Sequence, residues 1–127
     1  MKVLLSIKPQ FAEMIFSGTK KYEFRRSLFK NPDVKTIVVY ASSPVQKVVG
    51  EFEIESIIND KLASLWEQTK KYAGIGEDYF FKFFSNKEYG YAIHIKNVKK
   101  YRKALCLRKD FNAKPPQSFM YLNAGTV

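Results

Sequence analysis

A short basic segment with one carboxylate at its centre holds the residues best suited to chemistry. Residues 16–26, FSGTKKYEFRR, surround one acid with four cations: Glu23 with Lys20, Lys21, Arg25 and Arg26. On a strand, residues two apart share a face, so Lys21, Glu23 and Arg25 are predicted to point to the same side. Lys20 lies beside the turn at Gly18 and can reach the same space. We therefore expect a cluster in which Glu23 stays ionised and holds the cations in fixed positions.

This cluster has two functional interpretations and one purely structural one. It can present an ammonium and a guanidinium to a phosphate or a base edge, or it can pair Lys20 with Glu23 for proton transfer. The structural interpretation is an exposed ion pair on a strand, which contributes about 0–1 kcal/mol to stability and has no further role. The residue types alone leave all three open.

Two further segments are candidates for ligand contact. Ser42 and Ser43 follow an apolar stretch, where hydroxyls and free backbone amides can meet an anion, although the same residues also suit a turn cap. Gln117 and Ser118 follow a proline pair, which stiffens the backbone and lets their side chains be aimed at a base edge with little loss of entropy. The alternative for this second segment is that it only closes the floor of the fold.

The charge of the chain narrows the class of partner. The 127 residues include 22 Lys and Arg against 12 Asp and Glu, which gives a formal net charge of +10. This excess favours a polyanionic partner such as RNA or a nucleotide. The sequence has one His and one Cys, and it has no glycine-rich phosphate loop. We therefore predict no metal site and no cofactor.

The N-terminal residues indicate neither secretion nor membrane insertion. MKVLLSIKPQF contains an apolar run that is too short for a signal peptide and is interrupted by Lys8 and Pro9. No apolar run in the sequence approaches the roughly 20 residues that span a bilayer. Cys106 has no second cysteine with which to form an internal disulfide. We expect a cytoplasmic protein with no membrane partner, and the sequence leaves a protein partner open.

Hydrophobic periodicity predicts the elements that position these segments. The apolar and alternating patterns predict strands over 2–7, 19–27, 36–41 and 47–58 and a long strand or hairpin over 90–105. Helical spacing predicts a helix from Pro9 to a C-cap at Gly18, and two more helices over 62–74 and 76–86. A bulge is expected near Gly50, because the apolar residues around it cannot share one face. The segment after residue 114 is too rich in proline at its start to be a central strand.

The predicted order is β-α-β-β-β-αα-β-β. The hydrophobic content of 46% is enough for one core, and no linker interrupts the chain, so we expect a single domain over residues 1–127. Closing the sheet into a small β-barrel would hide its edges. The fold class predicted is α+β.

Several segments in order resemble the ASCH domain family, a branch of the PUA-like barrels. The family's G-x-K-x-x-E-x-R motif matches Gly18, Lys20, Glu23 and Arg25, and the similarity continues through VVYASSP, VVGEFEIE, GYAIHI and PPQSF. The resemblance implies a small PUA-like mixed β-barrel of about five to six strands, with a short N-terminal helix and a two-helix insert. It also implies a basic cleft, built on this motif, that binds RNA, nucleotides or modified nucleosides. Family members are described as RNA-binding proteins or regulators of transcription.

The same resemblance leaves an enzymatic alternative open. Some family members resemble an N4-acetylcytidine amidohydrolase, with a lysine as base and, three positions later, a threonine as nucleophile. Lys20 matches that lysine, but Glu23 replaces the threonine, and a carboxylate cannot supply the same nucleophile. Other members resemble ribonucleases, in which Lys20 would stabilise a phosphorane and Glu23 would take a proton. A hydrolase acting on RNA or on a modified nucleoside is thus the alternative to a binding domain.

Overall fold

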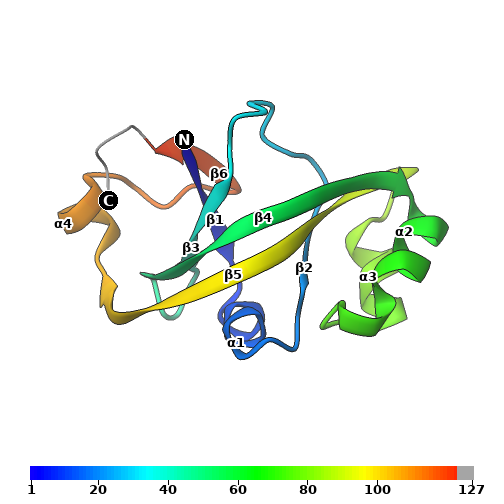
Figure 1. The fold of residues 1–127 in the computed structure, drawn as a ribbon, viewed down its shortest axis with the longest axis horizontal. Coiled ribbons are helices and arrows are strands. Elements are labelled where there is room, and N and C mark those ends of the chain that lie inside the picture. The colour runs from blue at the N-terminus through cyan, green and yellow to red at the C-terminus, as the bar shows by residue number, and fades with distance from the viewer. Residues whose placement is uncertain (123–127) are drawn as a thin grey trace.

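One mixed six-stranded sheet organises the protein, whose computed structural model describes residues 1–122 (Figure 1). The strands are β1 (Lys2–Ile7), β2 (Tyr22–Arg25), β3 (Thr36–Ala41), β4 (Lys47–Lys61), β5 (Tyr89–Leu105) and β6 (Phe119–Leu122). They lie in the order β2-β5-β4-β3-β1-β6, with β1 parallel to β3 and all other neighbours antiparallel. The last strand, β6, lies at an edge of the sheet, which agrees with the prediction that this segment is not a central strand. The mixed sheet and its helices confirm the α+β class.

The sheet is open, so the predicted closed barrel is wrong. Within residues 1–122, β2 pairs only with β5 and β6 pairs only with β1, which leaves two free edges. The strand β2 has four residues, fewer than the nine predicted for this strand from residues 19–27. A side chain bridges the opening in place of a backbone ladder. The guanidinium of Arg25 donates to the carbonyl oxygens of Ser6 at 3.3 Å and Ser118 at 2.9 Å.

The first helix, α1 (Pro9–Ser17), forms as predicted. Pro9 occupies its first turn, where a missing backbone N–H costs nothing, and Ala12 and Ile15 are buried against the sheet. The helix ends at Gly18, whose φ of 86° lies in the left-handed region that glycine adopts without steric cost. The chain therefore turns sharply at Gly18 and delivers Lys20 to the sheet.

The long strands β4 and β5 form a ribbon with a bulge near its middle. Val39 pairs with Gly50 and Tyr40 pairs with Val48, so Val49 has no partner in this register, which confirms the bulge predicted near Gly50. A Cβ on Gly50 would come within 2.5 Å of the Phe16 ring, so only glycine fits here. The segment over 90–105 is one strand and no hairpin.

Helices cover the two ends of this ribbon (Figure 1). The insert comprises α2 (Leu62–Thr69), the 3₁₀ helix η1 (Lys70–Tyr72) and α3 (Glu77–Phe83). Its aromatic residues Trp66, Phe80 and Phe84 pack with Phe24 of β2 in one buried cluster, as their spacing predicted. A short helix at the other end, α4 (Leu107–Phe111), was not predicted. None of the helices that residues 1–122 form is long and apolar enough to cross a membrane.

Candidate functional site

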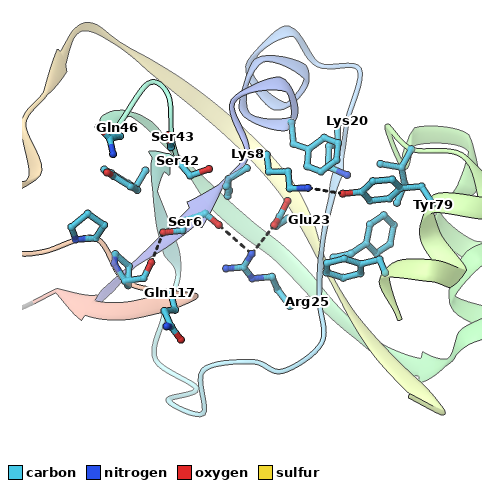
Figure 2. A pocket seen from close by; sticks show the side chains of 18 residues that line it. Ser6, Lys8, Lys20, Glu23, Arg25, Ser42, Ser43, Gln46, Tyr79 and Gln117 are labelled. Carbon is cyan, nitrogen blue, oxygen red and sulfur yellow. Dashed lines mark hydrogen bonds and ion pairs between the residues drawn. The ribbon is translucent and has the colours of Figure 1, made fainter. Parts of the chain in front are cut away.

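A cavity of about 470 Å³ opens where the motif strand meets several other segments (Figure 2). One wall comes from β2 and the start of α1, and another comes from the insert. The remaining wall comes from the β3–β4 turn and from the segment that precedes β6. The polar residues that line it are Ser6, Lys8, Lys20, Glu23, Arg25, Tyr40, Ser42, Ser43, Gln46, Tyr79 and Gln117. Cavities of this size hold small organic ligands.

Lys20 is buried in the wall of this cavity, with 2% of its surface exposed. Its Nζ donates to the carbonyl oxygen of Ala73 at 2.6 Å, and it lies about 5 Å from the ring centres of Phe11 and Phe24. Burial lowers the pKa of Lys20 to about 8, and the Glu23 carboxylate partly opposes that shift. Lys20 therefore exchanges its proton closer to neutral pH than an exposed lysine does.

Glu23 lies beside Lys20 in the same wall and is 5% exposed. Its Oε2 accepts a hydrogen bond from Nη1 of Arg25 at 3.1 Å. Burial raises the pKa of Glu23, while Arg25 and Lys20 oppose that shift. The sequence-based expectation considered only the neighbouring cations, and the effect of burial on the pKa outweighs theirs. The pKa values of Lys20 and Glu23 are thus shifted toward each other.

The guanidinium of Arg25 uses its N–H groups to bond other residues of the protein, and these bonds connect the segments of the site. Besides Glu23, its guanidinium contacts the carbonyl oxygen of Ser6 (Figure 2). It also contacts the carbonyl oxygen of Ser118, and its Nη2 lies 3.5 Å from the Ser118 Oγ. These contacts fix Arg25 in one orientation, since a guanidinium donates in a rigid plane. The geometry makes Arg25 the group that positions Glu23.

Hydroxyl and amide groups form the wall opposite the motif strand. Ser42, Ser43 and Gln46 come from the β3–β4 turn, whose backbone is tied to β1 by the Ser42 N–H that donates to Ile7 at 2.9 Å. Gln117 reaches the cavity from the segment before β6. Neutral donors and acceptors of this kind suit the edge of a base or a sugar hydroxyl.

Aromatic rings and a lysine form the wall on the insert side. Tyr79 of α3 accepts a hydrogen bond at its hydroxyl oxygen from the Nζ of Lys8 at 3.3 Å. The Tyr79 ring meets the Phe11 ring edge to face, with 5.7 Å between centres, and Phe83 lines the same wall. Lys8 is exposed, so its charge remains accessible to an anion at the mouth of the cavity.

The predicted site residues separate into two groups. Lys20, Glu23, Arg25, Ser42, Ser43 and Gln117 all line the cavity. Lys21 does not face Glu23: its ammonium lies 4.4 Å from the ring centre of Tyr72. Gly18 shapes the turn, and Ser118 supplies oxygen atoms to Arg25.

Several lining residues were not predicted. Gln46 and Tyr40 flank the two serines in sequence, so the turn that contains Ser42 and Ser43 was the signal that could have found them. Lys8 and Tyr79 lie 71 positions apart and meet only because the insert folds back over α1. Within residues 1–122, no group of three or more His, Cys, Asp or Glu side chains is arranged to hold a metal ion.

Both the sequence and the fold of this chain are similar to those of known proteins. The model of the ASCH domain matches residues 5–110. A protein of Zymomonas mobilis named ASCH domain-containing ribonuclease is 30% identical over 124 residues, covering 95% of this chain and 84% of that protein. The crystal structure of ASCH from Zymomonas mobilis superposes with a TM-score of 0.89 at 28% identity, over 98% of this chain and 90% of the other.

A longer relative matches as well. The large ribosomal subunit protein uL22 of Ureaplasma parvum serovar 3 is 28% identical over 120 residues, which cover 94% of this chain. The chain spans 39% of the length of that protein, so the similarity concerns one part of it.

Proposed function

Because this chain belongs to the ASCH domain family, we propose that it binds RNA and seats one nucleotide of the strand in the cavity. The observation that carries the proposal is the composition of the cavity wall, in which rings, amides and hydroxyls surround a buried lysine. Rings can stack on a base, and amides and hydroxyls can bond its edge. The net charge of +10 would attract the phosphate backbone. A role in RNA metabolism or transcription would rest on this binding.

Two glutamines at the rim of the cavity provide the test. Gln46→Glu and Gln117→Glu each add a negative charge to the cavity wall, where it would repel the anionic nucleotide, with little change in shape. We expect each to weaken binding of uridine monophosphate and of a short RNA at least about tenfold, as charge repulsion across a short distance does. The matched control is Gln10→Glu, an exposed residue of α1 that does not line the cavity. Equal affinity of all three variants would contradict the proposal.

Cleavage of RNA is a second candidate function, favoured by the opposite pKa shifts of Lys20 and Glu23. In this mechanism Glu23 takes the proton of a ribose 2′-hydroxyl, and the oxygen attacks the adjacent phosphorus. The bond from phosphorus to the 5′-oxygen breaks, and Lys20 gives its proton to that oxygen. The products are a 2′,3′-cyclic phosphate and a 5′-hydroxyl. Acid–base catalysis works best with pKa values near the working pH, and both shifts go in that direction.

Glu23→Gln separates binding from cleavage. If Glu23 is the base, this variant should bind RNA as the wild type does and cleave it about 10²-fold or more slowly. If Glu23 only fixes Arg25 and the wall, nonspecific affinity should hold while discrimination between two RNA sequences falls. An RNA with a 2′-deoxy residue at the cleavage position should bind and stay intact. Unchanged turnover and unchanged discrimination in Glu23→Gln would refute both roles.

A further inference from the structure

A second basic surface adjoins the cavity, and the proposed function does not use it. We propose that an RNA strand leaving the cavity continues over this surface, which we call the basic ridge and define by Lys47, Arg102, Lys103, Arg108 and Lys109. The inference rests on the proposed function, because the cavity gives the strand its starting point. The ridge would bind phosphates and extend the length of RNA that the protein covers.

The course of the chain places the ridge at the rim of the cavity. Gln46 lines the cavity, and Lys47 follows it directly at the start of β4. Val48 pairs with Leu105 at the end of β5, so Lys47 lies beside the segment that carries the other four cations. Figure 1 shows the β3–β4 turn next to the end of β5 that leads into α4. A strand that crosses the turn from the cavity therefore reaches the ridge.

The ridge is a folded surface, unlike a flexible basic tail. Leu107 and Phe111 pack with Tyr40 in a buried cluster, and the partly buried Tyr101 and Leu105 pack against it. The five cations of the ridge lie between or next to residues of this cluster in the sequence, and all five are exposed. Because its backbone is held by the core, less conformational entropy is lost when an RNA strand binds the ridge than when it binds a flexible tail.

The charges of the ridge are not neutralised by neighbouring carboxylates. Along residues 1–122, no carboxylate lies within ion-pair distance of any of its five cations. An earlier lysine of β5 does have an acidic partner, because Lys96 forms an ion pair with Glu55 at 3.0 Å. Asp110 is the one acid between residues 99 and 110, and its Oδ2 accepts a bond from the backbone N–H of Cys106 at 2.7 Å. The ridge therefore has charge available for a polyanion.

The five side chains that define the ridge are all cations, with no ring or amide among them. The Tyr101 ring beside the ridge is half-buried, and its hydroxyl donates to Glu51 at 2.8 Å, so this ring is not free to stack on a base. The contacts that exposed lysines and arginines make with phosphates carry no sequence information. The ridge should therefore add affinity that depends on RNA length and on salt, and sequence preference should come from the cavity.

The test compares two double variants on RNAs of two lengths. Arg102→Gln/Lys103→Gln neutralises part of the ridge, and Lys61→Gln/Lys87→Gln removes the same charge from exposed positions at the far end of the ribbon. Binding of oligouridylates of about 3 and about 15 nucleotides, close to the lower and upper ends of the usual site sizes, is measured by fluorescence anisotropy at several salt concentrations. The ridge variant should bind the trimer like the wild type. It should bind the 15-mer about tenfold more weakly, with a slope of log K against log salt that is shallower by about 1.

The experiment tests the proposal about the ridge and the proposal about the cavity separately. Equal weakening of the 15-mer by both double variants overturns the ridge, because bulk charge alone would then explain the loss. Failure of the trimer to bind the wild type contradicts the proposed function, while dependence of the 15-mer on the ridge still supports the ridge as an RNA surface. Loss of binding to vesicles of phosphatidylcholine and phosphatidylserine, with RNA binding unchanged, would overturn the proposal by assigning the ridge to a membrane.

Discussion

Lys20 is a buried lysine whose contribution to stability depends on pH. Its pKa is about 8 in the folded protein, against an ordinary value of 10.5. Between these values the unfolded chain binds more protons, so the free energy of unfolding should rise with pH, by up to about 3 kcal/mol. Below pH 8 the cost of burying the ammonium is present in full. Lys20→Met lacks this titration, so its stability should not show that rise.

Urea unfolding at pH 7, 8.5 and 10 measures this difference between Lys20→Met and the wild type. Lys21→Met is the matched control, because Lys21 is adjacent in sequence and exposed. The difference in the free energy of unfolding between the wild type and Lys20→Met should change with pH. The difference between the wild type and Lys21→Met should stay nearly constant. Parallel profiles for all three proteins would show that Lys20 keeps an ordinary pKa.

At the scale of single residues, the motif could be located from the sequence but its electrostatics could not. The alternation of side chains along a strand correctly places Glu23 and Arg25 on one face and Phe24 on the other, where its ring packs against the insert. It fails for Lys21, because β2 begins one residue later and the alternation does not extend to a residue outside the ladder. The burial of Lys20 depends on Ala73, 53 positions away, and local spacing holds no information about that contact.

At the scale of elements, Arg25 connects the edges that the open sheet leaves apart. Arg25→Ala removes the partner of the buried Glu23 and the donors to the Ser6 and Ser118 carbonyls. Breaking a buried pair from one side leaves an unpaired charge, so we expect a loss of about 3 kcal/mol in the free energy of unfolding, measured with urea. The double variant Glu23→Gln/Arg25→Ala should lose less than the sum of the single losses. Additive losses would mean that the pair does not couple β2 to the rest of the sheet.

One glycine of the insert, Gly74, packs directly against the side chain of Lys20. Gly74 has a φ of 71°, and a Cβ added there would lie 2.8 Å from the side chain of Lys20. Gly74→Ala should therefore lower the free energy of unfolding by at least about 1–2 kcal/mol and weaken nucleotide binding, because Lys20 must move. Gly76→Ala is the control, since its Cβ would meet no atom within 4 Å and its φ is −82°. Equal stability and affinity of the two variants would disprove the coupling.

The elements themselves were largely predictable, and their pairing was less so. The helix α1 has both of its end signals in Pro9 and Gly18, and the bulge near Gly50 follows from local periodicity. The short α4 has no side-chain cap at Cys106 and only five residues, so it gave no comparable signal. Closure of the sheet depends on whether β2 reaches β6, a contact between distant segments that local patterns cannot decide. The Arg25 bridge shows how the chain stabilises the open form.

At the scale of the whole molecule, the net charge of +10 should make RNA binding strongly dependent on salt. If about 4 phosphates are neutralised, the slope of log K against log salt should be near −3 for single-stranded RNA, because each contact releases condensed counterions. The uncharged nucleoside uridine, which can enter the cavity but offers no phosphate, should show almost no slope. Titration of both ligands over the same salt range distinguishes the electrostatic attraction of phosphates to the whole molecule from binding by contacts within the cavity. A flat response for RNA would refute phosphate binding, and a steep response for uridine would show that salt acts on the cavity itself.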